Sequence, residues 1–194
     1  MNPNELSNII KNRRAVYHKF YTGEKVPHEV IMEMLENANW APTHRHTEPW
    51  RFVVFEGVGL KKLADFQAMR YKETLTKEVS FDETMFEKLK SKPLLCSHVI
   101  AIGMRRDPRR SVPEVEELAS VACAVQNMWL TASVYGAGCY WSTGGVTYDE
   151  GAKAYFGLGE ADKLMGFLNI GMPDESNLTG RRRPVEEKVM WVTG

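Results

Sequence analysis

The stretch between Val115 and Tyr135 constrains the fold of this 194-residue chain most strongly. Its apolar residues recur at helical spacing, and together they cover much of the circumference of the helix that this spacing predicts. They are Leu118, Val121, Ala122, Val125, Met128, Trp129 and Ala132. A helix that is apolar around most of its surface has to be buried. We therefore expect this helix to lie at the centre of the protein or at an interface between subunits.

Helical and extended patterns alternate along the rest of the chain, and no linker separates them. Runs rich in β-branched and aromatic residues predict strands at 51–56, 97–104, 138–143 and 163–172, and a further strand near the end of 180–192. Helices are predicted after Pro3, after Pro27, on the surface within 59–90, and behind a cap at Asp149. The sequence therefore predicts one mixed domain over residues 1–194, with about five strands.

Composition excludes several classes of partner. The 25 Lys and Arg residues balance 25 Asp and Glu residues, so there is no overall basic field to attract nucleic acid or anionic lipid. No apolar run approaches the roughly 20 residues that span a bilayer, and the N-terminus lacks the pattern of a signal peptide. We expect a cytoplasmic protein with no membrane or nucleic-acid partner.

The three cysteines are odd in number and far apart. Cys96, Cys123 and Cys139 stand among apolar or small residues. This spacing fits neither a disulfide framework nor a metal site, so all three are expected to be small core residues.

Two arginine clusters stand near opposite ends of the chain. Arg13 and Arg14 follow the first predicted helix, and the second cluster is Arg181, Arg182 and Arg183. Each alone is typical of a solvated surface patch. Together they have the geometry to clamp a phosphate, which would relieve the repulsion between the guanidinium groups. A third basic segment, "RRDPRR" at 105–110, is expected to be a solvated loop, although it also offers charge for a donor 2′-phosphate.

No dedicated catalytic group stands out. His44 and His46 form a His-x-His pair without a third ligand at suitable spacing, so no metal site is expected. Gly144 and Gly145 follow a predicted strand, where they form either a plain turn or a place for a flat ligand to approach the backbone. Because there is neither a metal nor an activated nucleophile, an enzyme of this kind needs a cofactor for its chemistry.

Five segments in order carry a family resemblance: "NRRAVYHKF", "APTHRHTEPWRFVV", "GAGCYWSTGG", "FLNIGMP" and "RRRPVEEKVMW". Over residues 8 to 191 the chain resembles the nitroreductase family of FMN-dependent oxidoreductases, and in particular its compact bacterial members. The resemblance implies an α+β three-layer sandwich, in which helices flank a mixed, mainly antiparallel sheet of about five strands. It also implies a homodimer that binds FMN at its interface and whose terminal segments wrap the other subunit.

The resemblance also implies which residues bind the cofactor. In the family the two arginine clusters share the FMN phosphate, the proline-flanked loop reaches the flavin from the partner subunit, and the segment before the glycine turn lies along the isoalloxazine. The implied cofactor-binding residues are Arg13, Arg14, Ala15, Tyr17, Trp40, Thr43, His44, His46, Trp141, Ser142, Thr143, Gly144, Arg181, Arg182 and Arg183. No side chain is assigned a catalytic role, because the chemistry takes place at flavin N5, near the backbone of Thr143 and Gly144.

The implied reaction is a ping-pong cycle. NADH or NADPH gives hydride to flavin N5, and an electron-poor acceptor such as a nitroaromatic or a quinone then receives it. The alternative is a flavin-binding carrier, or a specialised flavin enzyme of the dehalogenating or flavin-fragmenting type. Three positions depart from the family pattern: Ala15 replaces a hydroxyl residue, Tyr17 replaces a basic residue, and Glu48 stands where Gln is common.

Overall fold

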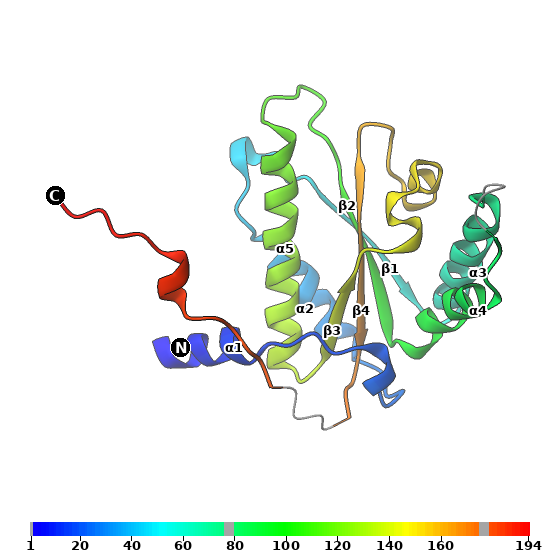
Figure 1. Ribbon diagram of the computed structural model, residues 1–194, viewed down its shortest axis with the longest axis horizontal. Coiled ribbons are helices and arrows are strands. Elements are labelled where there is room, and N and C mark those ends of the chain that lie inside the picture. The colour runs from blue at the N-terminus through cyan, green and yellow to red at the C-terminus, as the bar shows by residue number, and fades with distance from the viewer. Residues whose placement is uncertain (1, 76–79, 175–178) are drawn as a thin grey trace.

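A four-stranded sheet lies between two layers of helices. The computed structural model describes residues 2–75, 80–174 and 179–194. The sheet has the order β1 (Trp50–Glu56), β2 (His98–Met104), β4 (Lys163–Gly171) and β3 (Gly138–Ser142). Helices α2 (His28–Asn39) and α5 (Glu114–Val134) cover one face, and α3 (Val58–Glu73) and α4 (Glu83–Ser91) cover the other (Figure 1). The α+β class and the three-layer sandwich expected from the sequence are confirmed.

The long apolar helix forms as predicted, and it is buried on only one side within this chain. Val121, Val125 and Met128 of α5 are fully buried, and they share a core cluster with Met34 of α2 and Ile100 of β2. The opposite face of α5 is exposed. It forms a stripe of apolar and small residues, namely Val115, Ala119, Cys123 and Val134.

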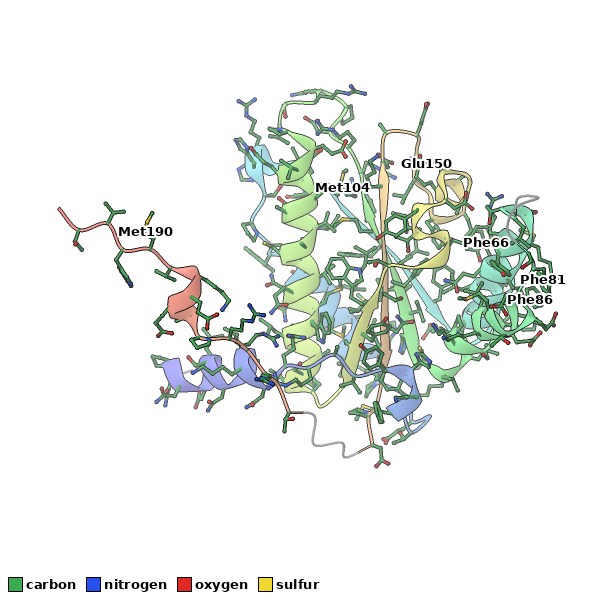
Figure 2. All side chains as sticks on the ribbon, viewed as in Figure 1. Phe66, Phe81, Phe86, Met104, Glu150 and Met190 are labelled. Carbon is green, nitrogen blue, oxygen red and sulfur yellow. The ribbon has the colours of Figure 1, made fainter. Side chains whose placement is uncertain are left out.

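The strand count corrects one expectation. All three strand pairings of the sheet are antiparallel, and within the described ranges the sheet has four strands rather than about five. The predicted strand near the C-terminus does not form there. Residues Val185–Lys188 make a 3-10 helix, η6, and Met190 lies on a tail that leaves the body of the protein (Figure 2). A strand requires a neighbouring strand, and this tail meets none within 2–75, 80–174 and 179–194.

Cysteine burial corrects a second expectation. Cys96 and Cys139 are buried, as predicted, whereas Cys123 is exposed. It belongs to the outward-facing stripe of α5, so it is exposed although Val121 and Ala124, its neighbours in sequence, are buried.

The remaining helices are short and largely follow the predicted positions. Helix α1 (Pro3–Asn12) begins with a capping box between Asn2 and Glu5 and ends where the first arginine pair begins. Asp149 caps the next predicted helix, but this segment, η5 (Glu150–Phe156), has 3-10 geometry. Further 3-10 turns are η1 (His18–Phe20), η2 (His44–His46), η3 (Lys92–Leu95) and η4 (Gly145–Tyr148). None of the helices in the described ranges is long and apolar enough to cross a membrane.

Aromatic contacts join α3 to α4 on the outer side of the sheet (Figure 2). The ring of Tyr71 in α3 lies 5.9 Å from that of Phe81, which precedes α4, and the Lys72 ammonium of α3 lies 4.1 Å from the centre of the Phe86 ring in α4. These contacts hold the two helices together as one layer, because a cation attracts the negative face of an aromatic ring.

Candidate functional site

The first arginine pair lies beside the edge strand of the sheet. The segment that follows α1 runs parallel to β3, where the Val16 amide donates a hydrogen bond to the Cys139 carbonyl at 2.9 Å. Gly138 permits this approach, because a Cβ at that position would lie 2.9 Å from the Cβ of Val16. Two segments that the sequence singled out, 13–17 and 141–144, therefore belong to one edge of the fold.

A buried tyrosine fixes this edge. The Tyr21 hydroxyl lies 2.9 Å from the Val16 carbonyl oxygen, 3.1 Å from that of Gly138 and 2.9 Å from that of Asn169. Burial raises the pKa of Tyr21 above its ordinary value, so the hydroxyl keeps its proton. One side chain thus connects the N-terminal segment to β3 and β4.

The two arginine clusters meet at the lower end of α5 in Figure 1. The Arg13 guanidinium lies 4.5 Å from the centre of the Trp129 ring. Burial lowers the pKa of Arg13, and the charges of Arg182 and Arg14 lower it further. Arg13, Arg14 and Arg182 therefore lie close enough to repel one another, and none forms an ion pair within the described part of the chain.

Arg14 has an unsatisfied donor. Its Nη1 donates to the carbonyl oxygens of Lys11 and Arg13, but its buried Nε has no hydrogen-bond partner among the described residues. Gly180 packs against the same guanidinium group. A buried donor of this kind is costly unless a partner satisfies it, and an anion at this position would supply both an acceptor and a countercharge.

A cavity of about 580 Å³ lies between the sheet and the α3–α4 layer. Ser142, Thr143 and Gly144 form part of its wall, together with Tyr140 and Asn169. The ring of Tyr140 lies 4.5 Å from that of Tyr17, which links the cavity to the segment that carries the arginine pair. The segment that carries Arg13 and Arg14 therefore reaches the wall of the cavity through Tyr17.

Trp141 points away from this cavity. Side chains alternate along β3, so Trp141 packs on the α5 side of the sheet, where its indole nitrogen donates to the Met165 carbonyl at 2.9 Å. Within this chain its role is to hold β3 against β4. A contact between Trp141 and the flavin stays a prediction.

Asn169 orients the end of β3 at the cavity wall. Its amide nitrogen donates to the Ser142 hydroxyl and to the Tyr140 carbonyl, each at 3.0 Å. The hydrogen bonds fix the backbone of β3 just before the Thr143–Gly144 turn.

A bidentate ion pair closes another side of the cavity. Arg70 of α3 donates from Nε to Asp149 Oδ2 at 2.7 Å and from Nη2 to Asp149 Oδ1 at 2.9 Å. The hydrogen bonds from Arg70 lower the pKa of Asp149. Because Asp149 also caps η5, this pair fastens the α3–α4 layer to the segment that follows the glycine turn.

The proline-flanked loop lies far from this site in the same chain. His44 Nδ1 lies 2.5 Å from Glu116 Oε2, in the first turn of α5, and Thr43 accepts a hydrogen bond from the Glu48 amide. Glu116 precedes Trp129 by thirteen positions, which corresponds to roughly 20 Å along a helix. The structure therefore does not bring Thr43, His44 or His46 to the arginine cluster within one chain. Trp40 follows the end of α2, where Asn37 donates a hydrogen bond to the Thr131 hydroxyl of α5, and the Trp40 side chain is exposed.

The family model described as "Nitroreductase family" matches residues 10–172. The chain belongs to the nitroreductase family. The prediction made from its five motifs is confirmed.

Individual relatives agree with this assignment. The chain is 28% identical over 184 residues to YfhC of Bacillus subtilis, which is named as an NAD(P)H nitroreductase, and the match covers 94% of this chain and 92% of the relative. A nitroreductase-like family protein from Bacillus cereus superposes with a TM-score of 0.85 at 30% identity, over 100% of this chain and 99% of that one. The FMN-dependent nitroreductase NfnB from Mycobacterium smegmatis, solved in complex with NADPH, has a TM-score of 0.76 at 17% identity, with 98% and 99% covered.

Several residues of the nitroreductase-family site carried no clear signal in the sequence. Arg70, Lys92, Tyr140 and Asn169 all line the cavity, yet none of them was expected at the site from the sequence, although Tyr140 lies within one of the five motifs. Arg70 and Asp149 are 79 residues apart, so their pairing is visible only after folding. Asn169 lies within the "FLNIGMP" motif, whose spacing gives no sign of its contact with Ser142.

Proposed function

We propose that this nitroreductase-family chain is an FMN-dependent NAD(P)H oxidoreductase that reduces an electron-poor acceptor, such as a nitroaromatic or a quinone, by a ping-pong cycle. One observation carries the proposal. Three arginines from opposite ends of the chain converge with an unsatisfied buried donor, Nε of Arg14, and their segment contacts, through Tyr17 and Tyr140, a cavity whose wall includes the Thr143–Gly144 turn.

The residues present fit FMN. Arg13, Arg14 and Arg182 would hold its phosphate, because planar guanidinium groups match phosphate oxygens and a dianion offsets their mutual repulsion. The cavity of about 580 Å³ would accept the ring system, with Tyr17 and Tyr140 along the route between the two. Of the three C-terminal arginines, Arg182 is the one whose charge acts on Arg13.

When bound, FMN supplies the hydride chemistry, accepting hydride at N5 from NAD(P)H and passing it to the acceptor. The protein positions the reactants. Asn169 and Ser142 fix the end of β3, and the Arg70–Asp149 pair holds the cover of the cavity in place. The exposed backbone after Ser142 offers amide donors toward the cavity, which is the type of group that stabilises charge developing on a ligand. No side chain has to act as a general base.

A homodimer would complete the site. The exposed stripe on α5 is apolar for a surface helix, and its burial against a second copy would remove that surface from water. If the two copies of α5 crossed antiparallel, the loop at the start of one helix would lie near the arginine cluster at the end of the other. This arrangement would place the partner's loop, with Thr43, His44 and His46, at the flavin.

The C-terminal tail would contribute to the same dimer. Met190 and Trp191 are each 85% exposed, and no described segment pairs with the outer edge of β1. An apolar groove lies beside that edge, lined by Met32, Leu35, Trp50 and Phe52 among others. A tail from the second copy that added a strand to β1 would supply the fifth strand expected from the sequence.

The first test is the visible absorption spectrum of the purified protein, followed by anaerobic addition of NADH and then NADPH. A flavin spectrum that is bleached by either donor supports the reductase. A flavin that neither donor bleaches would favour the carrier or the specialised flavin enzyme instead.

The second test is the double variant Arg13→Ala/Arg14→Ala. We expect it to lose most of its bound flavin, because phosphate binding depends on these charges. The matched control is Arg109→Ala/Arg110→Ala, which removes the same charge from an exposed loop and should retain flavin. Unchanged flavin content in the first variant would refute the phosphate site.

A further inference from the structure

A second cluster of cations lies at the cavity, apart from the three arginines. Lys92 lines the cavity at the end of α4, together with Met85 and Leu89. Lys88 lies one turn before Lys92, on the face of α4 that carries the cavity-lining Met85 and Leu89. His18 belongs to η1, which contacts η3, and it follows Tyr17, whose ring contacts the cavity-lining Tyr140. Three elements thus bring His18 and Lys88 near Lys92, the member of this cluster that lines the cavity.

The charges that act on His18 and Lys92 are all positive. Burial lowers the pKa of Lys92, and the charge of Lys88 lowers it further. Burial also lowers the pKa of His18, and Lys92, Lys88 and Lys19 add to the effect. No carboxylate counteracts these shifts, and none of the three forms an ion pair within the residues that the structure describes.

The other cation that lines the cavity among the described residues is paired, because Arg70 is bound by Asp149 and Glu73. Lys90 lies on the opposite side of α4, beside Asp65 and Phe86, and is 3.7 Å from Glu87. The unpaired charges are therefore concentrated where Lys92 enters the cavity. A cavity lined with charge of one sign raises the local concentration of ligands of the opposite sign.

We propose that His18, Lys88 and Lys92 bind an anionic substituent, a carboxylate or phosphate, on the small molecule that the reductase uses. The inference rests on the proposed oxidoreductase function and specifies its substrate class. The cluster is distinct from Arg13, Arg14 and Arg182, to which we assign the phosphate of the cofactor.

The anion has two possible sources, which experiment separates. If it belongs to the acceptor, the enzyme prefers 4-nitrobenzoate to 4-nitrobenzamide, which has a similar shape but no charge. If it belongs to the donor, the enzyme prefers NADPH to NADH, because the two differ only in the 2′-phosphate. The reduction of 4-nitrobenzamide by the unmodified enzyme tests the general reductase function independently.

The decisive experiment compares kcat/KM ratios in the Lys88→Gln variant and the unmodified enzyme. We expect the ratio for 4-nitrobenzoate over 4-nitrobenzamide, or for NADPH over NADH, to fall by roughly three- to tenfold, as loss of one nearby charge predicts. The matched control, Lys90→Gln, removes the same charge from the paired position on the same helix and should leave both ratios unchanged. The bound flavin is quantified in the unmodified enzyme and in each variant.

His18 provides an independent readout through pH. Its protonation adds a third positive charge, so the preference for 4-nitrobenzoate, whose carboxylate stays ionised, should increase as pH falls through the lowered pKa of His18. The charged groups that act on it are Lys19 on its own turn, Lys88 on α4 and Lys92 on η3. In His18→Asn this increase should disappear.

Two results would overturn the proposal. Both ratios could remain unchanged in Lys88→Gln, which would mean that no anionic substituent reaches the cluster. Alternatively, flavin content could fall in Lys88→Gln while both ratios stay constant, which would mean that the cluster holds the cofactor and not the substrate.

Discussion

At the scale of single residues, the site contrasts a satisfied guanidinium with an unsatisfied one. Arg70 uses all of its nitrogens on Asp149 and Glu73, whereas Nε of Arg14 is buried and has no partner among the residues that the structure describes. A guanidinium whose donors are filled by the protein serves the structure. One that is left incomplete is available to an anionic ligand.

The Arg70–Asp149 pair leads to a pH-dependent prediction for Asp149→Asn. The amide retains an oxygen to cap η5 but loses the charge, so we expect a loss of about 1 kcal/mol in the free energy of unfolding at pH 7. Because the folded pKa of Asp149 is lowered, its charge stabilises the fold above the ordinary aspartate value of about 3.9 and the benefit is lost as pH falls through the folded pKa.

Thermal unfolding of both proteins at pH 7 and below pH 4 checks this prediction. The difference in melting temperature should narrow in acid. A difference of the same size at both pH values would show that the charge of Asp149 is not what stabilises the fold.

At the scale of elements, the docking of the N-terminal segment on β3 creates the site. This contact depends on Gly138, which admits Val16, and on Tyr21, whose hydroxyl meets three carbonyl oxygens. Neither residue lines the cavity. We expect them to affect cofactor binding through the position of Arg13 and Arg14.

Tyr21→Phe should loosen this docking. Removing the hydroxyl takes a hydrogen-bond donor away from these carbonyl oxygens. We expect this change to lower the free energy of unfolding by about 1–2 kcal/mol and to weaken FMN binding. Chemical denaturation and a flavin titration measure the two effects. Tyr148→Phe is the control, because Tyr148 is 76% exposed and should change neither quantity. Undiminished flavin affinity in Tyr21→Phe would mean that the arginine cluster forms without this anchor.

At the scale of the whole molecule, three features of one chain are incomplete. The stripe on α5 is uncovered, the outer edge of β1 has no described partner, and the proline-flanked loop lies roughly 20 Å along α5 from the arginine cluster. A second copy related by a two-fold axis would complete all three. This is why we place the flavin site at a subunit interface.

Ala119→Arg tests that placement. A charged, bulky side chain in the centre of the α5 stripe should prevent the two copies from packing, so we expect a monomer that binds flavin at least tenfold more weakly. Light scattering gives the oligomeric state, and circular dichroism checks the fold. Ala161→Arg makes the same substitution at an exposed turn and should remain dimeric. A monomeric Ala119→Arg with full flavin content would argue against an interfacial site.

The sequence by itself determined the elements of this protein and its family. The period of α5, the β-branched runs of the four strands and the cap at Asp149 were all predicted, because backbone conformation depends mainly on local pattern. The five motifs identified the nitroreductase family for a similar reason: each is a contiguous segment. Local pattern gave wrong predictions for the tail strand and for the burial of Cys123, because both depend on whether another segment packs against these residues.

Only the tertiary structure decided which of those elements meet. It brought Arg182 to Arg13, turned Trp141 away from the cavity, paired Arg70 with Asp149 and placed His18 beside Lys92. Each of these outcomes depends on contacts between residues distant in sequence or on which face of an element is covered. A periodic pattern indicates that a helix or strand has a buried face, but the tertiary packing determines which element covers that face.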